Sequence, residues 1–150
     1  MKPAASSAPT PAAGPESLLF VYGTLRRGGS NDIARLLPEA VRICGARMRG
    51  HLFDLGDYPA LVADASAAWV EGEIYEIPEH GWSALDALED VVSATHPNGE
   101  YFSLTGLAHD AHGRPWQCQV YVANPAVMRL DHPIAGGDWL DYASRRDTGP

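Results

Sequence analysis

Basic residues are scarce in this chain of 150 residues, which has 11 Lys and Arg against 19 Asp and Glu. The formal net charge at neutral pH is therefore −8. Nucleic-acid binding depends on a basic surface that neutralises phosphates, and an acidic chain is repelled by an anionic membrane surface. Neither nucleic acid nor a membrane is therefore predicted as a partner, although net charge does not exclude a local anion site.

The sequence also lacks an apolar run of the roughly 20 residues that a bilayer span needs. Its first residues, MKPAASSAPTPAAGPES, contain no continuous apolar core of a secretory signal, so a cytoplasmic location is expected. Cysteine is limited to Cys44 and Cys118, which fall on separate strand-like runs and lack the spacing of a zinc site. Because disulfides are rare in the cytosol, both are expected to be buried free thiols.

What is present fits one domain of ordinary hydrophobicity, with 45% apolar residues. Residues 1–16 are rich in Ala, Pro and Ser and are predicted to be a flexible tail, before one domain over 17–146 and a second tail over 147–150. Strands are predicted over 18–22, 41–55, 58–63, 69–77, 101–108 and 116–123, and helices over 30–37, 78–92 and 139–144. Strands dominate, which predicts an α+β fold, a small mixed β-barrel with flanking helices.

Local signals refine these elements. The apolar run at 18–22 is typical of a strand that is buried on both faces. Ser30 or Asn31 is expected to cap the first helix and Asp138 the last one. A strand irregularity is expected at a glycine of the second strand, Gly45 or Gly50.

A glycine-rich turn, Gly23 to Gly29, follows the first predicted strand. Glycine lets a ligand approach the main chain, and N–H groups before a helix favour negative charge, so this turn is a candidate anion cradle. It lacks the Gly-Lys-Ser/Thr ending of a Walker A loop and the G-x-G-x-x-G pattern of dinucleotide sites. An ordinary strand-to-helix turn is the alternative. A serine hydrolase has no support, because the chain contains no Gly-x-Ser-x-Gly motif.

Glu89 is the candidate acid/base of the chain. A step of about 100° per residue places it between Trp82 and Leu85, on the apolar side of its helix. Burial raises the pKa of a carboxyl group, which makes a Glu useful as a general base and acid near neutral pH. The alternative is a structural Glu at the edge of the apolar face, bonded to a buried Arg, Tyr or backbone N–H.

Tyrosines and histidines offer further candidates. Five tyrosines lie on predicted strands or beside turns, where their hydroxyls seek partners from the protein or a ligand: Tyr22, Tyr58, Tyr75, Tyr101 and Tyr121. Plain core filling is expected for Tyr58 and Tyr75. His109 and His112 flank a hairpin turn and are expected to be solvated, and no metal is predicted because a metal site needs a third ligand.

Several segments, taken together and in order, carry a family resemblance. Phe-Val-Tyr-Gly-Thr-Leu-Arg-Arg-Gly at 20–28 resembles the Tyr-Gly-Thr/Ser-Leu signature of γ-glutamyl cyclotransferase-like proteins, and the Ser-Asn that follows suits their γ-glutamylamine cyclotransferase branch. Val-Glu-Gly-Glu-Ile-Tyr at 70–75 resembles a strand of that family, and Leu-Asp-Ala-Leu-Glu at 85–89 resembles the helix whose Glu is catalytic. Segments 121–124 and 134–139 are similar to its C-terminal elements.

The resemblance implies a pocket between the first-strand turn and the helix that holds Glu89, the catalytic residue. It implies that the α-amine of a γ-glutamyl-amine attacks its own γ-carbonyl and releases 5-oxoproline and the free amine, without a metal or organic cofactor. The substrate-binding residues that it implies are Tyr22, Gly23, Thr24, Leu25, Tyr101 and Tyr121. Many members have Tyr-x-Arg after the Glu, whereas this chain has Ser103 at the Arg position.

Other interpretations stay open at this point. One is a non-catalytic protein that binds a small anion or metabolite on the same fold, and another is a phosphate or nucleotide site at 23–29. For the enzyme, the amine side of the pocket is expected to include 54–58 and 95–99, where Asp54 and Asp57 would attract a cationic amine. Gly23→Val is expected to reduce substrate binding more than stability, because a Cβ would block the main chain.

Overall fold

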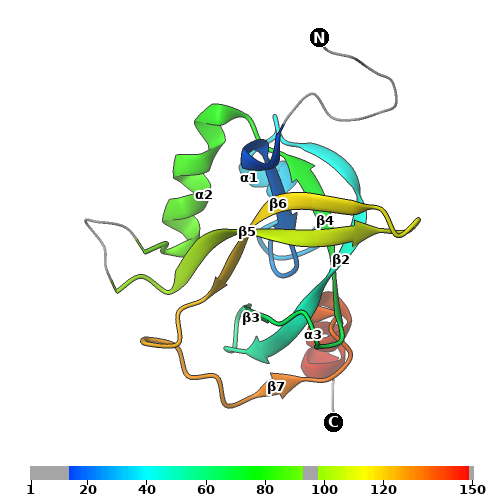
Figure 1. Cartoon of the computed structure of the whole chain (residues 1–150). Helices are drawn as coiled ribbons and strands as arrows, with labels where there is room; N and C mark the ends of the chain where they lie inside the picture. The colour runs from blue at the N-terminus through cyan, green and yellow to red at the C-terminus, as the bar shows by residue number, and fades with distance from the viewer. Residues whose placement is uncertain (1–13, 93–97, 149–150) are drawn as a thin grey trace.

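The computed structural model describes residues 14–92 and 98–148, and most of its strands form a small closed barrel (Figure 1). The strands are β1 Leu18–Val21, β2 Val41–Asp54, β3 Pro59–Ala63, β4 Trp69–Glu76, β5 Tyr101–Asp110, β6 Pro115–Ala123 and β7 Pro133–Ile134. The barrel order is β2-β4-β1-β6-β5, and β5 returns to β2. The β1–β6 pair is parallel and the pairs of β4 with β1 and β2 are antiparallel, so the expected mixed α+β barrel is confirmed.

Strand β1 is buried on both faces, as its continuous apolar run predicts. Alternate side chains of a strand point to opposite faces. Leu18 and Phe20 therefore pack with side chains from the other barrel strands, whereas Leu19 and Val21 pack with apolar residues of the helices outside the barrel. The strand thus joins two apolar clusters, and its C-terminal end leads directly into the glycine-rich turn.

Strand β2 belongs to the barrel only in its first part. From Ala46 to Leu52 its residues alternate between buried and exposed, the pattern of a strand with one face on the core. Its later residues pair with β3 and β7, a short strand that the sequence pattern did not reveal. The irregularity lies between Arg42 and Cys44 rather than at Gly45 or Gly50, which keep regular partners on β4 and β3.

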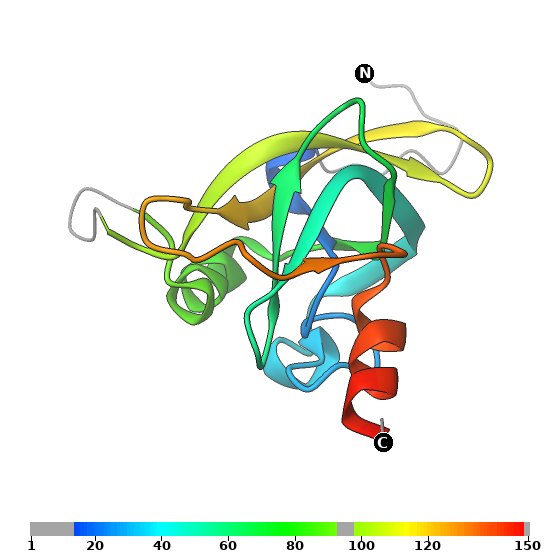
Figure 2. The same ribbon diagram turned by 90° about the horizontal axis from the view of Figure 1, so that it is seen from below.

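The described residues form three α-helices outside the barrel: α1 Ile33–Leu36, α2 Trp82–Glu89 and α3 Trp139–Thr148. Figure 2 shows α2 and α3 at separate places on the barrel. Asp32, rather than Ser30 or Asn31, caps α1, because its carboxylate accepts the N–H of Ala34 at 2.9 Å. Asp138 caps α3 as expected, accepting the N–H of Asp141 at 3.1 Å.

Helix α2 is shorter than the helix predicted over 78–92. Residues 79–81 form a 3₁₀ turn before it, and Asp90 ends it with φ 55° and ψ 58°. This left-handed conformation is tolerated by Asp better than by most non-glycine residues. The N–H of Asp90 bonds back to Ala87, so the chain turns away immediately after Glu89. None of the helices in the described ranges is long and apolar enough to cross a membrane.

Several side chains differ from the sequence-based expectation. Both cysteines are free, but only Cys118 is buried, whereas Cys44 is half-buried. His112 lies in the exposed turn, whereas the His109 ring packs edge-on against Trp69, with the ring centroids 5.4 Å apart. Among the described residues no group of three or more His, Cys, Asp or Glu side chains could hold a metal ion.

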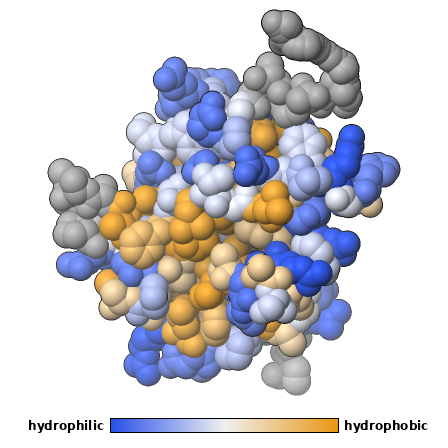
Figure 3. All heavy atoms as spheres, viewed as in Figure 1, coloured by the Kyte–Doolittle hydropathy of each residue, from blue (hydrophilic) through white to orange (hydrophobic). Residues whose placement is uncertain are grey.

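Apolar side chains also reach the surface. Figure 3 shows them gathered across the middle of the face that Figure 1 presents, where α2, β5 and β3 lie. The exposed large apolar residues of the described chain include Leu88 of α2 and Phe102 and Leu104 of β5. Leu88 is 44% exposed and lines a pocket.

Candidate functional site

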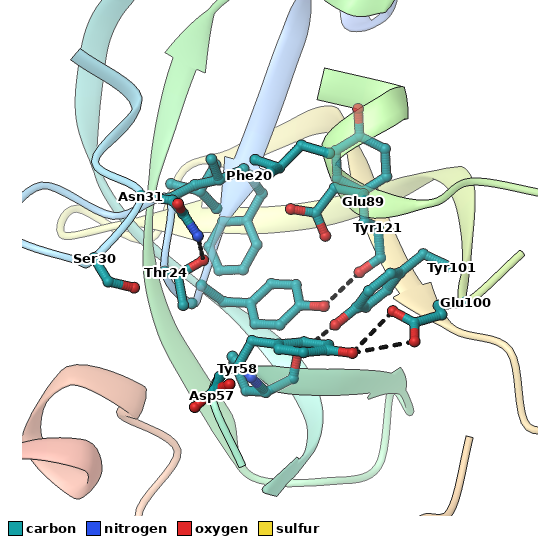
Figure 4. Close-up of a pocket in the computed structure, with 16 residues that line it drawn as sticks. Phe20, Thr24, Ser30, Asn31, Asp57, Tyr58, Glu89, Glu100, Tyr101 and Tyr121 are labelled. Atoms are coloured by element: carbon teal, nitrogen blue, oxygen red, sulfur yellow. Dashed lines mark hydrogen bonds between the residues drawn. The ribbon is translucent and has the colours of Figure 1, made fainter. Parts of the chain in front are cut away.

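A pocket of about 380 Å³ opens between the glycine-rich turn, helix α2 and the strands β5 and β6 (Figure 4). Its volume is in the range of small-molecule sites. Seven of the lining residues are the predicted catalytic and substrate-binding residues: Tyr22, Gly23, Thr24, Leu25, Glu89, Tyr101 and Tyr121. The fold therefore brings together residues that lie up to 99 positions apart in the chain, such as Tyr22 and Tyr121.

The turn after β1 is fixed to the barrel by a buried carboxylate of β4. Glu73 is 5% exposed, and its Oε2 lies 2.6 Å from the Nε of Arg26. Its Oε1 accepts the N–H of Arg27 at 2.9 Å. A second bond, 3.1 Å long, joins Arg26 to Asp138 at the start of α3. Two distant elements thus hold the main chain of this turn in place.

The first part of this turn offers unpaired backbone donors. The N–H groups of Gly23, Thr24 and Leu25 donate no hydrogen bond to the part of the chain that the structure describes, although all three residues are buried. Buried N–H groups without a partner are rare in folded proteins, so these donors fit a ligand that carries an acceptor.

The second part of the turn is not available to a ligand. The N–H of Gly28 donates to Asp32 at 2.9 Å, and the N–H of Gly29 donates to the carbonyl of Arg26 at 2.8 Å. The N–H of Arg27 donates to Glu73. The backbone N–H groups that a phosphate cradle over 23–29 would need are therefore already bonded to the protein in this part of the turn. The candidate anion site is therefore narrower than expected and consists of 23–25.

Gly23 has a different role from the one its sequence context suggested. A Cβ at this position would lie 2.7 Å from Cγ of Pro59, inside the packed wall, and not in open space facing a ligand. Gly23→Val is therefore expected to lower stability by about 1–3 kcal/mol through overpacking, measured by chemical denaturation. Gly45→Val is the matched control, because a Cβ there meets only the end of Arg42 at 3.6 Å. Equal stability of both variants would contradict this packing argument.

Glu89 points into the pocket from the last turn of α2 (Figure 4). Its carboxylate is half-buried and has no hydrogen bond or ion pair within the described ranges, so the expected alternative of a structural Glu with a fixed partner finds no support there. Burial, and next the negative charge of Glu100, raise the pKa of Glu89 from 4.5 to about 7. A carboxyl group with such a pKa can both accept and donate a proton at neutral pH.

The tyrosines around Glu89 have their hydroxyl protons committed to the protein. Tyr22 donates to the carbonyl of Tyr121 at 2.6 Å, and Tyr101 donates to that of Pro59 at 2.7 Å. Tyr121 donates to Asp86, one turn before Glu89 on α2, at 2.8 Å. These rings shape and rigidify the wall, and the backbone N–H groups of the turn remain the donors for a ligand.

Comparison with known proteins decides the family. The model of the family described as gamma-glutamyl cyclotransferase, AIG2-like, matches residues 19–141. The chain belongs to this family. A Halalkalibacterium halodurans protein named "Putative gamma-glutamylcyclotransferase BH1612" is 38% identical over 100 residues, which are 66% of this chain and 86% of that protein.

Other proteins and solved structures match over smaller shares or with lower identity. Gamma-L-glutamyl-butirosin B gamma-glutamyl cyclotransferase of Niallia circulans is 39% identical over 74 residues, 48% of this chain and 45% of that protein. The crystal structure of YkqA from Bacillus subtilis has a TM-score of 0.69 at 28% identity, over 89% of this chain and 43% of that one. The mouse AIG2-like protein has a TM-score of 0.60 at 25% identity, over 77% and 84%.

The structure adds pocket residues that the cyclotransferase motifs did not reveal. Glu100 lines the pocket beside Glu89, and Tyr58 is not core filling, because its hydroxyl donates to Glu100 at 2.9 Å. Tyr75, by contrast, is buried in the apolar core as expected. The other lining residues, which were not predicted to bind the substrate, are Phe20, Val21, Ser30, Asn31, Pro59 and Leu88. A carboxylate directly before Tyr101 was visible in the sequence, but only the fold shows where it points.

Of the segments expected on the amine side, only a part lines the pocket. Asp57 and Tyr58 do line the pocket. Asp54 does not, because Tyr142 donates to its carboxylate at 2.6 Å and Arg146 forms an ion pair with it at 3.0 Å. Residues 95–97 lie outside the described ranges, and neither Asn98 nor Gly99 lines the pocket.

Proposed function

We propose that this protein is a γ-glutamyl cyclotransferase that acts on γ-glutamyl-amines and releases 5-oxoproline and the free amine, with Glu89 as acid and base. The observation that carries the proposal is Glu89 itself. It is a carboxyl group without a partner among the described residues, with a pKa of about 7, aimed into the pocket opposite three unpaired backbone donors. Its place in the Leu-Asp-Ala-Leu-Glu segment of a cyclotransferase family member supports the same role.

Substrate binding follows from the donors that the turn leaves free. The α-carboxylate of the glutamyl group is an acceptor, and the N–H groups of Gly23, Thr24 and Leu25 suit it. The hydroxyls of Thr24 and Ser30 lie on the same side of the pocket (Figure 4). A substrate held in this way has its α-amine directed towards Glu89, across the centre of the pocket.

The chemical step needs a proton acceptor before it needs anything else, because an ammonium group cannot attack a carbonyl. Glu89 removes the proton, the α-nitrogen forms a bond to the γ-carbonyl carbon, and the carbonyl oxygen becomes negative until the C–N bond to the amine breaks. Glu89 then gives its proton to the departing nitrogen as the C–N bond breaks. The ring nitrogen loses its second proton to the freed amine, which leaves as an ammonium ion, and the Glu89 carboxylate is regenerated. The attack is intramolecular, so the pocket mainly has to hold the conformation that closes the five-membered ring.

An amine is favoured over glutathione as the leaving portion by the charge of the pocket. Among its described lining residues the charged side chains are Asp57, Glu89 and Glu100, all acidic. A neutral or cationic leaving portion is compatible with these charges, whereas the glycine carboxylate of glutathione is repelled by them. The relative from Niallia circulans carries γ-L-glutamyl-butirosin B in its name, which supports variation at the amine side of the family.

The proposal is tested by incubating the purified full chain with a panel of γ-glutamyl compounds and measuring 5-oxoproline by mass spectrometry. The panel contains γ-glutamyl-ε-lysine, a neutral γ-glutamyl dipeptide, glutathione and an α-glutamyl peptide. We expect release from γ-glutamyl-ε-lysine at the highest kcat/KM and none from the α-glutamyl peptide. If glutathione is the best substrate by a wide margin, the amine preference is wrong; if no compound yields 5-oxoproline, the activity is wrong.

A further inference from the structure

Glu100 stands beside Glu89 because the chain on either side of residues 93–97 is joined again by hydrogen bonds. The Asp90 carboxylate accepts the N–H of Glu100 at 3.2 Å, and the carbonyl of Asp90 accepts the N–H of Tyr101 at 3.3 Å. The N–H of Val92 donates to the carbonyl of Tyr101 at 2.8 Å. These hydrogen bonds fix the end of α2 against the start of β5, so that the carboxylates of Glu89 and Glu100 both line one pocket.

The carboxylate of Glu100 is oriented by a hydrogen bond but is not paired with a positive charge within the described ranges. Both of its oxygens accept the hydroxyl of Tyr58, at 2.9 and 3.1 Å. No Lys, Arg or His of the described chain forms an ion pair with it. Its charge is close enough to Glu89 to contribute to the raised pKa of that residue. Two carboxylates that share a half-buried pocket repel each other, and a bound cation relieves that repulsion.

The position of Glu100 in the pocket indicates which cation it meets. Figure 4 shows Thr24, Ser30 and Asn31 on one side of the pocket and Glu100 on the opposite side, with Glu89 between them. The unpaired N–H groups of the turn, which suit the α-carboxylate, are on the first side. With the glutamyl group at the turn and its reacting atoms near Glu89, the amine portion extends towards Glu100.

We infer that Glu100, oriented by Tyr58, is a specificity-determining residue that selects γ-glutamyl-amines whose amine portion carries a second positive charge, the γ-glutamyl derivatives of diamines. This inference rests on the proposed function and names the chemistry of its leaving group. An ammonium group a few carbons from the scissile amide donates to the Glu100 carboxylate, while Tyr58 keeps that carboxylate in place. Charge-assisted hydrogen bonds of this kind change affinity by roughly 10- to 100-fold.

The test compares two amides of nearly equal shape, γ-glutamyl-putrescine and γ-glutamyl-pentylamide, in which a methyl group replaces the terminal ammonium. For the unaltered protein we expect kcat/KM to be roughly 10- to 100-fold higher for the putrescine amide. Glu100→Gln is expected to bring this ratio close to one, and Tyr58→Phe to reduce it. Glu79→Gln is the matched control, because Glu79 is an exposed carboxylate that does not line the pocket, and this variant should keep the ratio.

A structural role for Glu100 predicts different results. If Glu100→Gln lowers kcat/KM equally for both amides, or if the unaltered protein converts both equally well, the inference is overturned while the proposed function stands. If neither amide is converted, the proposed function fails and the inference with it. The comparison in the unaltered protein decides the matter even where a variant does not fold. Removal of the Glu100 charge should also move the acid limb of the kcat/KM profile to lower pH, since that charge raises the pKa of Glu89.

Discussion

Glu89→Gln is expected to reduce kcat by roughly 10²- to 10⁴-fold while the chain keeps its fold. Glutamine has the shape of glutamate but cannot accept the proton of the substrate ammonium. Steady-state release of 5-oxoproline measures the effect, and Glu79→Gln is the matched control, because Glu79 is an exposed residue of the 3₁₀ turn before α2. Activity of Glu89→Gln close to that of the unaltered protein would show that another group moves the proton.

The pH dependence of activity is part of the same expectation. Glu89 must be ionised to act as a base, and its pKa is raised to about 7. For the unaltered protein, kcat/KM should therefore rise with pH up to about 7 and level off above it. An acid limb near pH 4.5, the ordinary pKa of a Glu, would contradict the burial of this group.

Glu89→Gln is also expected to make the protein more stable above neutral pH. In the pH range between 4.5 and about 7 the unfolded chain releases the Glu89 proton while the folded chain retains it, so stability falls as pH rises through this range. A tenfold difference in proton affinity is worth about 1.4 kcal/mol, so the full cost is up to about 3 kcal/mol. Denaturant unfolding of both proteins at pH 4 and pH 8 measures it, and an equal difference at both pH values would contradict this account.

Arg26→Met is expected to be the most destabilising of the substitutions considered, by about 3 kcal/mol, because it leaves the buried Glu73 carboxylate without its cation. The same substitution frees the turn that carries the N–H groups of 23–25. KM should therefore rise at temperatures at which the variant is still folded. Chemical denaturation and steady-state kinetics measure the two effects.

The double variant Arg26→Met with Glu73→Gln serves as the control for Arg26→Met. The amide oxygen of the new glutamine still accepts the N–H of Arg27, and no unpaired charge is left, so most of the lost stability should return. If the stability losses of Arg26→Met and Glu73→Gln simply add in the double variant, Arg26 and Glu73 do not act as a pair, and their ion pair does not fix the turn after β1.

The barrel and the centre of the site were predictable from the sequence because they depend on local patterns. The apolar run of β1 predicts burial on both faces, and the helix that follows residue 78 predicts that Glu89 lies on its apolar side. The family motifs add the turn at 23–25. Each of these features depends on residues that are close together in the sequence, and this is the range over which periodicity and motifs carry information.

The features that the sequence did not reveal depend on contacts between distant segments. Glu100 enters the pocket only because the residues after α2 pair with the start of β5. Asp54 does not line the pocket, because its carboxylate bonds to Tyr142 and Arg146 of α3. Pro59 packs against Gly23 from a separate strand. Periodicity carries no information about such tertiary partners, so the pocket lining contributed by 54–59 and by Glu100 was predicted less well than the lining from the turn after β1.

The central claim is that the substrate's own α-nitrogen, and not water, attacks the γ-carbonyl. The most direct measurement is conversion of γ-glutamyl-putrescine and γ-glutamyl-ε-lysine by the purified full chain in oxygen-18 water, followed by mass spectrometry of all products. Intramolecular attack keeps the carbonyl oxygen, so we expect unlabelled 5-oxoproline together with an equal amount of free amine. Glutamate labelled with oxygen-18 in its γ-carboxyl group, as the main product, would show hydrolysis and contradict the account.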